Sequence, residues 1–186
     1  MNIFNKILKI IFNGNSRADI LILDTSLLDN RFRKYELIHF SNGGGQFIDK
    51  YNNSSAETIS TFNNIIQNDL LIFNISFSSI ENIFIQSNIK RLKSFNKKDF
   101  GEIECNDTIT AFGTYDFAVA IENKNGIISH IWITGNATNN RDTQKIKNVL
   151  FDIAKNYQLI AVNWISMRYY SLLSPENSSD FIRQNF

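Results

Sequence analysis

This chain of 186 residues has few cysteines, few prolines and almost no net charge. Its single cysteine, Cys105, has no partner for an internal disulfide, and oxidised secreted domains of modest size usually carry an even set. We therefore expect a protein of the reducing cytoplasm. Pro175 is the only proline, and together with heavy use of asparagine and isoleucine this is typical of AT-rich coding sequence.

The formal net charge of +1 excludes a strong long-range field. We therefore expect neither non-specific attraction to nucleic acid nor a charge-driven membrane association, and local patches must support any such function. The hydrophobic fraction of 43% and the charged fraction of 20% are ordinary for a folded chain. Without internal repeats or a low-complexity linker, residues 1–186 are predicted to form a single domain.

Residues suited to catalysis or metal binding are also few. His39 and His130 are the only histidines and share no metal-binding motif, so a structural or surface role is favoured for each. Cys105 follows Glu102 and Glu104, whose charges disfavour a reactive thiolate. The glycines at 43–45 complete neither a phosphate loop nor a dinucleotide loop. We expect no cofactor, no metal and no enzymatic activity.

The first residues combine lysines with apolar side chains, which invites comparison with a signal peptide. Lys6 and Lys9 interrupt the apolar stretch that such a peptide needs, and no small-residue cleavage site follows. Apolar residues instead recur at helical spacing, so residues 1–15 are predicted to form a short amphipathic helix. Docking on the core is favoured over contact with a membrane surface, and no membrane span is expected.

The first half of the chain predicts strands at 20–23 and 34–40. Ser54 and Glu57 have the spacing of a helix-capping box, which predicts a helix that ends near residue 69 and leads into a strand at 70–77. The stretch 80–95 fits either a helix or a strand.

The second half has clearer patterns. Asn125 and Gly126 predict a tight turn between strands at 115–122 and 127–134. A single apolar stripe predicts a helix at 143–157, and branched and aromatic residues predict a strand at 159–167. Residues 174–186 have the composition of a polar tail. The fold class predicted is α+β, a mainly antiparallel sheet covered by two or three helices.

The large aromatic side chains of the second half divide into two groups. Trp132 and Trp164 lie in predicted strands, where large aromatics usually fill the core. Tyr169 and Tyr170 are adjacent, so in an extended chain they point to opposite faces and one of them should be accessible.

Carboxylates and exposed aromatics together are typical of protein-binding surfaces. An acidic stretch with neighbouring tyrosines provides this combination here, and a partner surface of this kind requires no catalytic geometry. The candidate partner-binding residues are Glu102, Glu104, Asp107, Tyr115, Asp116 and Tyr170.

In general build the chain resembles a bacterial immunity protein, the antidote encoded beside a secreted toxin. The resemblance is carried by the near-neutral compact domain, the AT-rich bias, the short start containing phenylalanine and lysine, and the lack of a catalytic motif. It implies binding to a cognate toxin domain by surface complementarity. It specifies neither the toxin nor an oligomeric state.

Two other functions stay open. The first is a small enzyme whose site is assembled from scattered polar residues such as Asp24, His39, Asp116 and His130. The second is a regulatory module that binds nucleic acid through the basic segment 90–98, in which Lys90, Arg91 and Lys93 would neutralise phosphates and Phe95 would stack on a base. The acidic residues that follow disfavour nucleic-acid binding.

Overall fold

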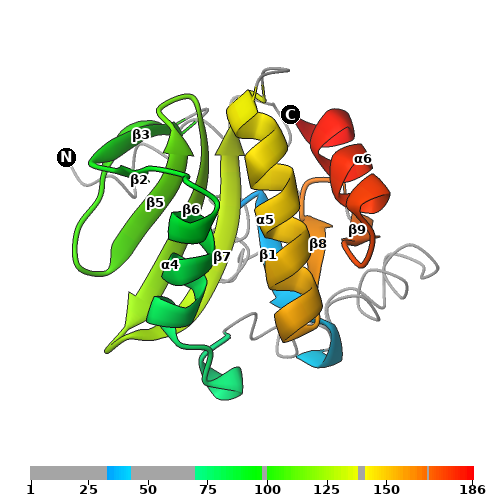
Figure 1. The fold of residues 1–186 in the computed structure, drawn as a ribbon, viewed down its shortest axis with the longest axis horizontal. Helices are drawn as coiled ribbons and strands as arrows, with labels where there is room; N and C mark the ends of the chain where they lie inside the picture. The colour runs from blue at the N-terminus through cyan, green and yellow to red at the C-terminus, as the bar shows by residue number, and fades with distance from the viewer. Residues whose placement is uncertain (1–32, 43–69, 98–99, 138–140, 167) are drawn as a thin grey trace, which may run out of the picture.

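The computed structural model describes residues 33–42, 70–97, 100–137, 141–166 and 168–186 (Figure 1). Four predictions therefore lie outside the described residues: the helix at 1–15, the strand at 20–23, the capping box at 54–57 and the glycine run at 43–45.

The described elements are organised around one antiparallel sheet of seven strands in the order β2-β5-β6-β7-β1-β8-β9. A separate two-stranded sheet is made by β3 and β4. The strands are β1 (Tyr35–His39), β2 (Arg91–Leu92), β3 (Ser94–Lys97), β4 (Gly101–Glu104), β5 (Ile109–Thr114), β6 (Phe117–Lys124), β7 (Ile127–Gly135), β8 (Leu159–Asn163) and β9 (Arg168–Ser171).

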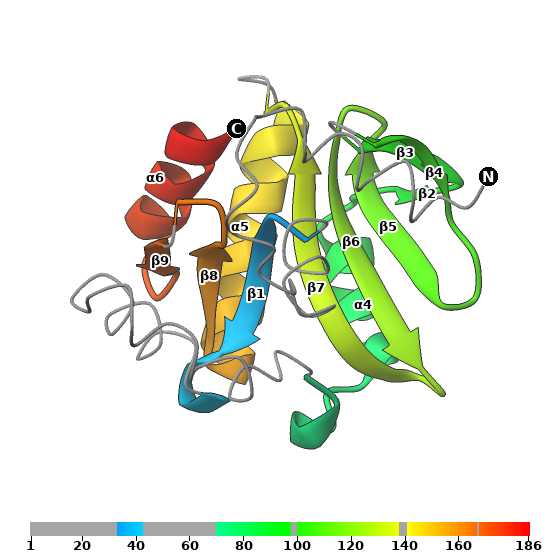
Figure 2. The ribbon, with the colours of Figure 1, turned by 180° about the vertical axis from the view of Figure 1, so that it is seen from behind.

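Three described helices lie on one face of this sheet, as Figure 1 shows: α4 (Phe77–Gln86), α5 (Arg141–Tyr157) and α6 (Pro175–Asn185). A short 3-10 turn, η1 (Phe40–Asn42), follows β1, and another, η3 (Leu70–Phe73), precedes α4. Viewed from behind, the β3–β4 pair lies on the other face (Figure 2). The prediction of an α+β fold with an antiparallel sheet covered by helices is confirmed.

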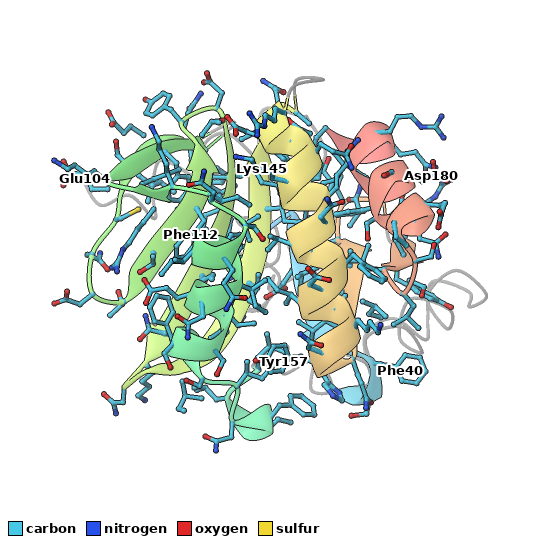
Figure 3. All side chains as sticks on the ribbon, viewed as in Figure 1. Phe40, Glu104, Phe112, Lys145, Tyr157 and Asp180 are labelled. Carbon is cyan, nitrogen blue, oxygen red and sulfur yellow. The ribbon has the colours of Figure 1, made fainter. Side chains whose placement is uncertain are left out.

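The main core lies between the sheet and the helices. Alternate strand residues point toward the helices, including the fully buried Leu37, Val119 and Ile131. Phe84 of α4 stacks on Phe112 of β5 with ring centroids 4.4 Å apart, and Phe112 is labelled between the two elements in Figure 3. These contacts hold the helical layer on the sheet.

The β6–β7 hairpin forms where the sequence predicts it. Asn125 and Gly126 take the positive φ angles of 55° and 78° that a tight two-residue turn requires. The first strand begins at Phe117, two residues later than expected, because Thr114 Oγ1 accepts the Phe117 N–H at 3.1 Å and holds Tyr115 and Asp116 in a turn. The preceding strand, β5, was not predicted.

Helix α5 also matches its apolar stripe, with Ile146, Val149, Leu150 and Ile153 all buried. The strand after it was predicted to reach residue 167, but β8 ends at Asn163. The Asn163 side chain accepts the backbone N–H groups of Ile165 and Ser166 at 3.0 and 3.1 Å, and this turn reverses the chain into β9.

The prediction of a strand at 70–77 is wrong. Leu70–Phe73 is a 3-10 turn, and Asn74 then takes a φ of 52°, which an extended strand does not accommodate. Only a short stretch runs beside β7, where Ile75 O accepts the Ile128 N–H at 2.9 Å. The ambiguous stretch that follows is divided between the rest of α4, β2 and the start of β3.

Residues 174–186 also differ from the prediction of a polar tail. Ser174 caps α6 by accepting the Asn177 N–H at 3.2 Å, and Pro175 occupies the first turn. Phe181 and Ile182 are buried in the main core, and the Phe186 ring lies 4.3 Å from that of Tyr35. The few apolar residues of this segment fall on one helix face, so a mostly polar composition still yields a core helix.

Candidate functional site

The β3–β4 pair covers the face of the sheet that the helices leave open. Phe95 of β3 is fully buried, and its ring centroid lies 5.6 Å from that of Trp132 on β7. Small side chains on β5 and β6 leave room for this contact, because Ala111, Ala118 and Ala120 complete the same cluster. The core role predicted for Trp132 is confirmed, and Trp164 is 7% exposed in a second cluster on the same face.

The outer side of β4 carries two of the candidate partner-binding carboxylates. Ile103 points inward against the Phe95 cluster, so Glu102 and Glu104 on either side of it point outward and are exposed. Ser94 Oγ donates a 2.6 Å hydrogen bond to Glu102 Oε1 across the pair. Figure 3 shows Glu104 extending from the edge of the molecule.

Two exposed aromatic residues flank the β3–β4 pair. Asn96, the pairing partner of Glu102, donates its N–H to the carbonyl of Tyr115 at 2.8 Å. The Tyr115 side chain is 46% exposed, and Phe100, next to the start of β4, is 45% exposed. Phe100, Glu102, Glu104 and Tyr115 together are called the hairpin surface below.

Asp107 and Asp116 are both exposed but do not lie together. Asp116 follows Tyr115 in the β5–β6 turn, and its carbonyl accepts the Asn136 N–H at 2.8 Å. Asp107 precedes β5, at the opposite end of that strand. A strand of six residues separates the two carboxylates by roughly 20 Å, so Asp116 extends the hairpin surface beside Tyr115, whereas Asp107 lies at the other end, three residues after Glu104.

Tyr170 is not brought together with the other candidates. It lies on β9, at the end of the sheet opposite β2, and its ring centroid is 5.1 Å from that of Phe181 in α6. Its neighbour Tyr169 is 41% exposed, so the prediction that these adjacent rings differ in accessibility is confirmed.

An internal polar network lies on the same face of the sheet as the β3–β4 pair, and no sequence pattern predicts it. Glu36 of β1 is 1% exposed, yet both its oxygens are bonded. Its Oε1 lies 2.8 Å from His130 Nδ1 on β7, and its Oε2 accepts the Trp164 Nε1–H at 2.9 Å. A buried carboxylate needs such partners, and here they join β1 to β7 and to the end of β8.

Glu122 of β6 is the centre of a second set of contacts on the same face. Arg33 donates to both of its oxygens at 2.9 Å, and Trp132 Nε1–H donates to Oε1 at 2.8 Å. Burial alone raises the pKa of this carboxyl, but the hydrogen bonds and charge of Arg33, with the nearby His130 and Trp132, hold the pKa below its usual value. Glu122 and His130 are cross-strand neighbours, so the two sets of contacts adjoin.

His39 lies apart from His130. It occupies the same face of β1 as Leu37, and its ring stacks on Phe73 at 3.7 Å. Burial lowers the pKa of His39, and its Nδ1 accepts a hydrogen bond from the Ser41 N–H at 3.1 Å. Of the set that the enzymatic alternative proposed, Asp24 lies outside the described residues, and the two histidines lie on opposite faces of the sheet.

Metal-binding geometry is not found in the part of the chain that the structure describes, where no group of three His, Cys, Asp or Glu side chains has it. Cys105 is half-buried beside a cavity of about 300 Å³ that Arg91 and Lys93 also line. Burial raises the pKa of its thiol, although a backbone hydrogen bond and the charge of Arg91 act in the opposite direction. A raised pKa keeps the thiol protonated and unreactive at neutral pH.

The basic segment 90–98 is divided between the surface and the interior, because Lys90, Arg91 and Lys93 are exposed while Phe95 and Lys97 are buried. Phe95 is buried against Trp132, so the prediction that it stacks on a base is wrong. Lys97 is 4% exposed, with its Nζ 4.5 Å from the Phe100 ring centroid. Arg91 pairs with Glu81 at 3.2 Å. Strand alternation explains the difference, because every second residue of β3 faces the sheet.

Comparison of the chain with protein-family models, with curated proteins and with solved structures found no significant match. Among the residues that the structure describes, no helix combines the length and the apolar character needed to cross a bilayer.

Proposed function

We propose that this protein is an immunity protein that neutralises a cognate bacterial toxin by binding it through the hairpin surface. The observation that supports this function is the position of Glu102 and Glu104 on the outside of β4, with the exposed aromatic residues Phe100 and Tyr115 flanking the β3–β4 pair. Aromatic anchors next to charged groups are the usual composition of an energetically important interface.

The way the surface is held also supports the proposal. Phe95 and Ile103 fasten the β3–β4 pair to the sheet, so the outward side chains stand on a packed base. A preorganised surface loses less conformational entropy when it binds. The two carboxylates favour a partner with lysine or arginine at the contact, because charge complementarity speeds association and rejects acidic partners.

The test is a protection assay in cells that express the toxin encoded beside this chain. We expect the chain to restore growth and the variant with both Glu102→Lys and Glu104→Lys to lose most protection. The matched control reverses two exposed carboxylates on the helical side, with Asp152→Lys and Glu176→Lys, and should protect fully. Equal protection by both double variants would exclude the hairpin surface, and failure of the unaltered chain to protect or bind would exclude the function.

The Glu36–His130 contact favours a second candidate, in which the protein acts on its target as an enzyme. A carboxylate that orients one nitrogen of a histidine is a common feature of general bases. His130→Asn, which keeps a donor near Glu36, separates the two functions. An enzyme would lose protection and keep toxin binding, whereas an inhibitor that acts by binding alone would keep both.

A further inference from the structure

A cavity of about 590 Å³ lies between the first half of α5 and the second half of α6. Figure 1 shows the yellow start of α5 beside the red end of α6. The volume falls within the range of small-molecule sites, about 300–1,000 Å³. None of the residues that line the cavity belongs to the hairpin surface or to the polar network.

The lining combines an apolar side with a polar side. Ile182 and Phe186 of the α6 segment, with Ala137, supply the apolar side. The polar side consists of Thr143, Lys147, Ser179, Asp180 and Arg183. Five polar and three apolar residues make this lining more polar than that of most small-molecule sites, and a polar side facing an apolar side suits a small amphipathic molecule.

The charges around the cavity favour an anion. Arg183 forms an ion pair with Asp180 at 2.8 Å, so these two charges offset each other. Among the described residues, no carboxylate lies within ion-pair distance of Lys147, which is half-buried at the cavity wall. The cavity also includes Thr143 from the first turn of α5, where the helix dipole is positive.

We infer that this cavity binds a small carboxylate that carries an apolar group, with the carboxylate at Lys147 and the apolar group against Ile182 and Phe186. In this arrangement Lys147 donates from its ammonium to a carboxylate oxygen, and Thr143 and Ser179 line the same cavity. Bonds between two charged groups are stronger than neutral ones, which gives a carboxylate an advantage over a neutral molecule of the same shape.

The inference is tested by titrating the full chain, isotopically labelled, with 3-phenylpropionate in backbone amide NMR spectra. We expect saturable shifts confined to amides near Thr143, Lys147 and Ser179, with a Kd on the order of 1 mM for so small a probe. The neutral analogue 3-phenylpropanamide should bind about tenfold more weakly, because it lacks the charge that Lys147 recognises.

Two variants complete the test. Lys147→Gln should weaken 3-phenylpropionate binding about tenfold, whereas Lys155→Gln on the same helix, where Lys155 lies 5.8 Å from the Phe151 ring centroid, should leave it unchanged. The spectra also show whether each variant is folded. The inference would be overturned if 3-phenylpropionate caused no saturable shifts in the unaltered chain. It would also be overturned if 3-phenylpropanamide bound as tightly as 3-phenylpropionate, or if Lys147→Gln bound 3-phenylpropionate as tightly as the unaltered chain.

The carboxylate can belong to a free acid or to the end of a peptide chain. The tetrapeptide Gly-Gly-Gly-Phe with a free carboxylate distinguishes these sources. Tighter binding of 3-phenylpropionate assigns the cavity to a free acid, and tighter binding of the peptide assigns it to a chain end. Both results support carboxylate recognition.

Discussion

At the scale of single residues, Glu122 shows how a charge is held on the face of the sheet opposite the helices. Its carboxylate receives two hydrogen bonds from Arg33 and one from Trp132, and the Arg33 and Glu122 side chains are only 13% and 18% exposed. A charge held this way stabilises the fold only while its partners remain in place.

Replacing Glu122 by Gln should reduce the free energy of unfolding by about 1–3 kcal/mol at neutral pH, because Arg33 loses its charged partner. The folded-state pKa of Glu122 lies below its usual 4.5, so its contribution is complete above that pH and is lost as pH falls through the folded-state value. Urea unfolding at several pH values measures both effects.

The difference in unfolding free energy between the unaltered chain and Glu122→Gln should therefore become smaller as the pH is lowered. The control is Asp152→Asn, an exposed carboxylate on α5 that should change stability very little. A difference that stays constant down to about pH 3 would contradict this account of Glu122.

At the scale of elements, Phe95 is the fully buried anchor of the β3–β4 pair. Phe95→Ala removes a fully buried ring from the cluster with Trp132, and we expect a loss of about 3–5 kcal/mol in unfolding free energy. The same change should shift tryptophan fluorescence to the red, because Trp132 becomes hydrated.

Ser94→Ala is the matched control on the same strand. Ser94 points to the outer side, where it bonds the exposed Glu102, so its removal should cost less than about 1 kcal/mol and leave the fluorescence unchanged. Similar costs for Phe95→Ala and Ser94→Ala would mean that the pair does not pack on the sheet as described.

Two glycines with positive φ angles differ in the space that surrounds them. Gly135, at the end of β7, has a φ of 107°, and an added Cβ would overlap the backbone of Asp116. Gly126 in the β6–β7 turn has a φ of 78° with no atom within 4 Å of an added Cβ.

Gly135→Ala should therefore cost several times more stability than Gly126→Ala, whose cost is the conformational strain of about 1 kcal/mol. Thermal unfolding of the two variants measures the comparison. Equal melting temperatures would show that the β5–β6 turn does not pack against the end of β7.

At the scale of the whole molecule, α6 closes the helical layer over β8 and β9. Phe181, Ile182 and Phe186 bring it into contact with the core and with Tyr35 of β1. A chain that ends at residue 173 should lose cooperative unfolding, because these apolar contacts are lost together.

Circular dichroism during urea unfolding measures that cooperativity. The control is a full-length chain with Glu176→Gln, which alters the exposed surface of α6 and leaves its buried face intact. A truncated chain with the unfolding midpoint of the full chain would contradict the role of α6 in the core.

The sequence by itself determined the features that depend on neighbours along the chain. The Asn125–Gly126 turn, the apolar stripe of α5 and the outward and inward faces at Tyr169 and Tyr170 follow from local backbone preference and periodicity. These signals lie within a few residues of the elements that they specify, so α+β class and antiparallel pairing could be predicted.

Only the tertiary structure decided which distant residues meet. Glu36 and His130 are 94 positions apart, and Glu36 and Trp164 are 128 apart, so no local pattern links them. Strand order and register place these groups on one face and separate His39 from them. The same holds for the burial of Phe95 and the docking of α6, because burial depends on which surface a segment packs against.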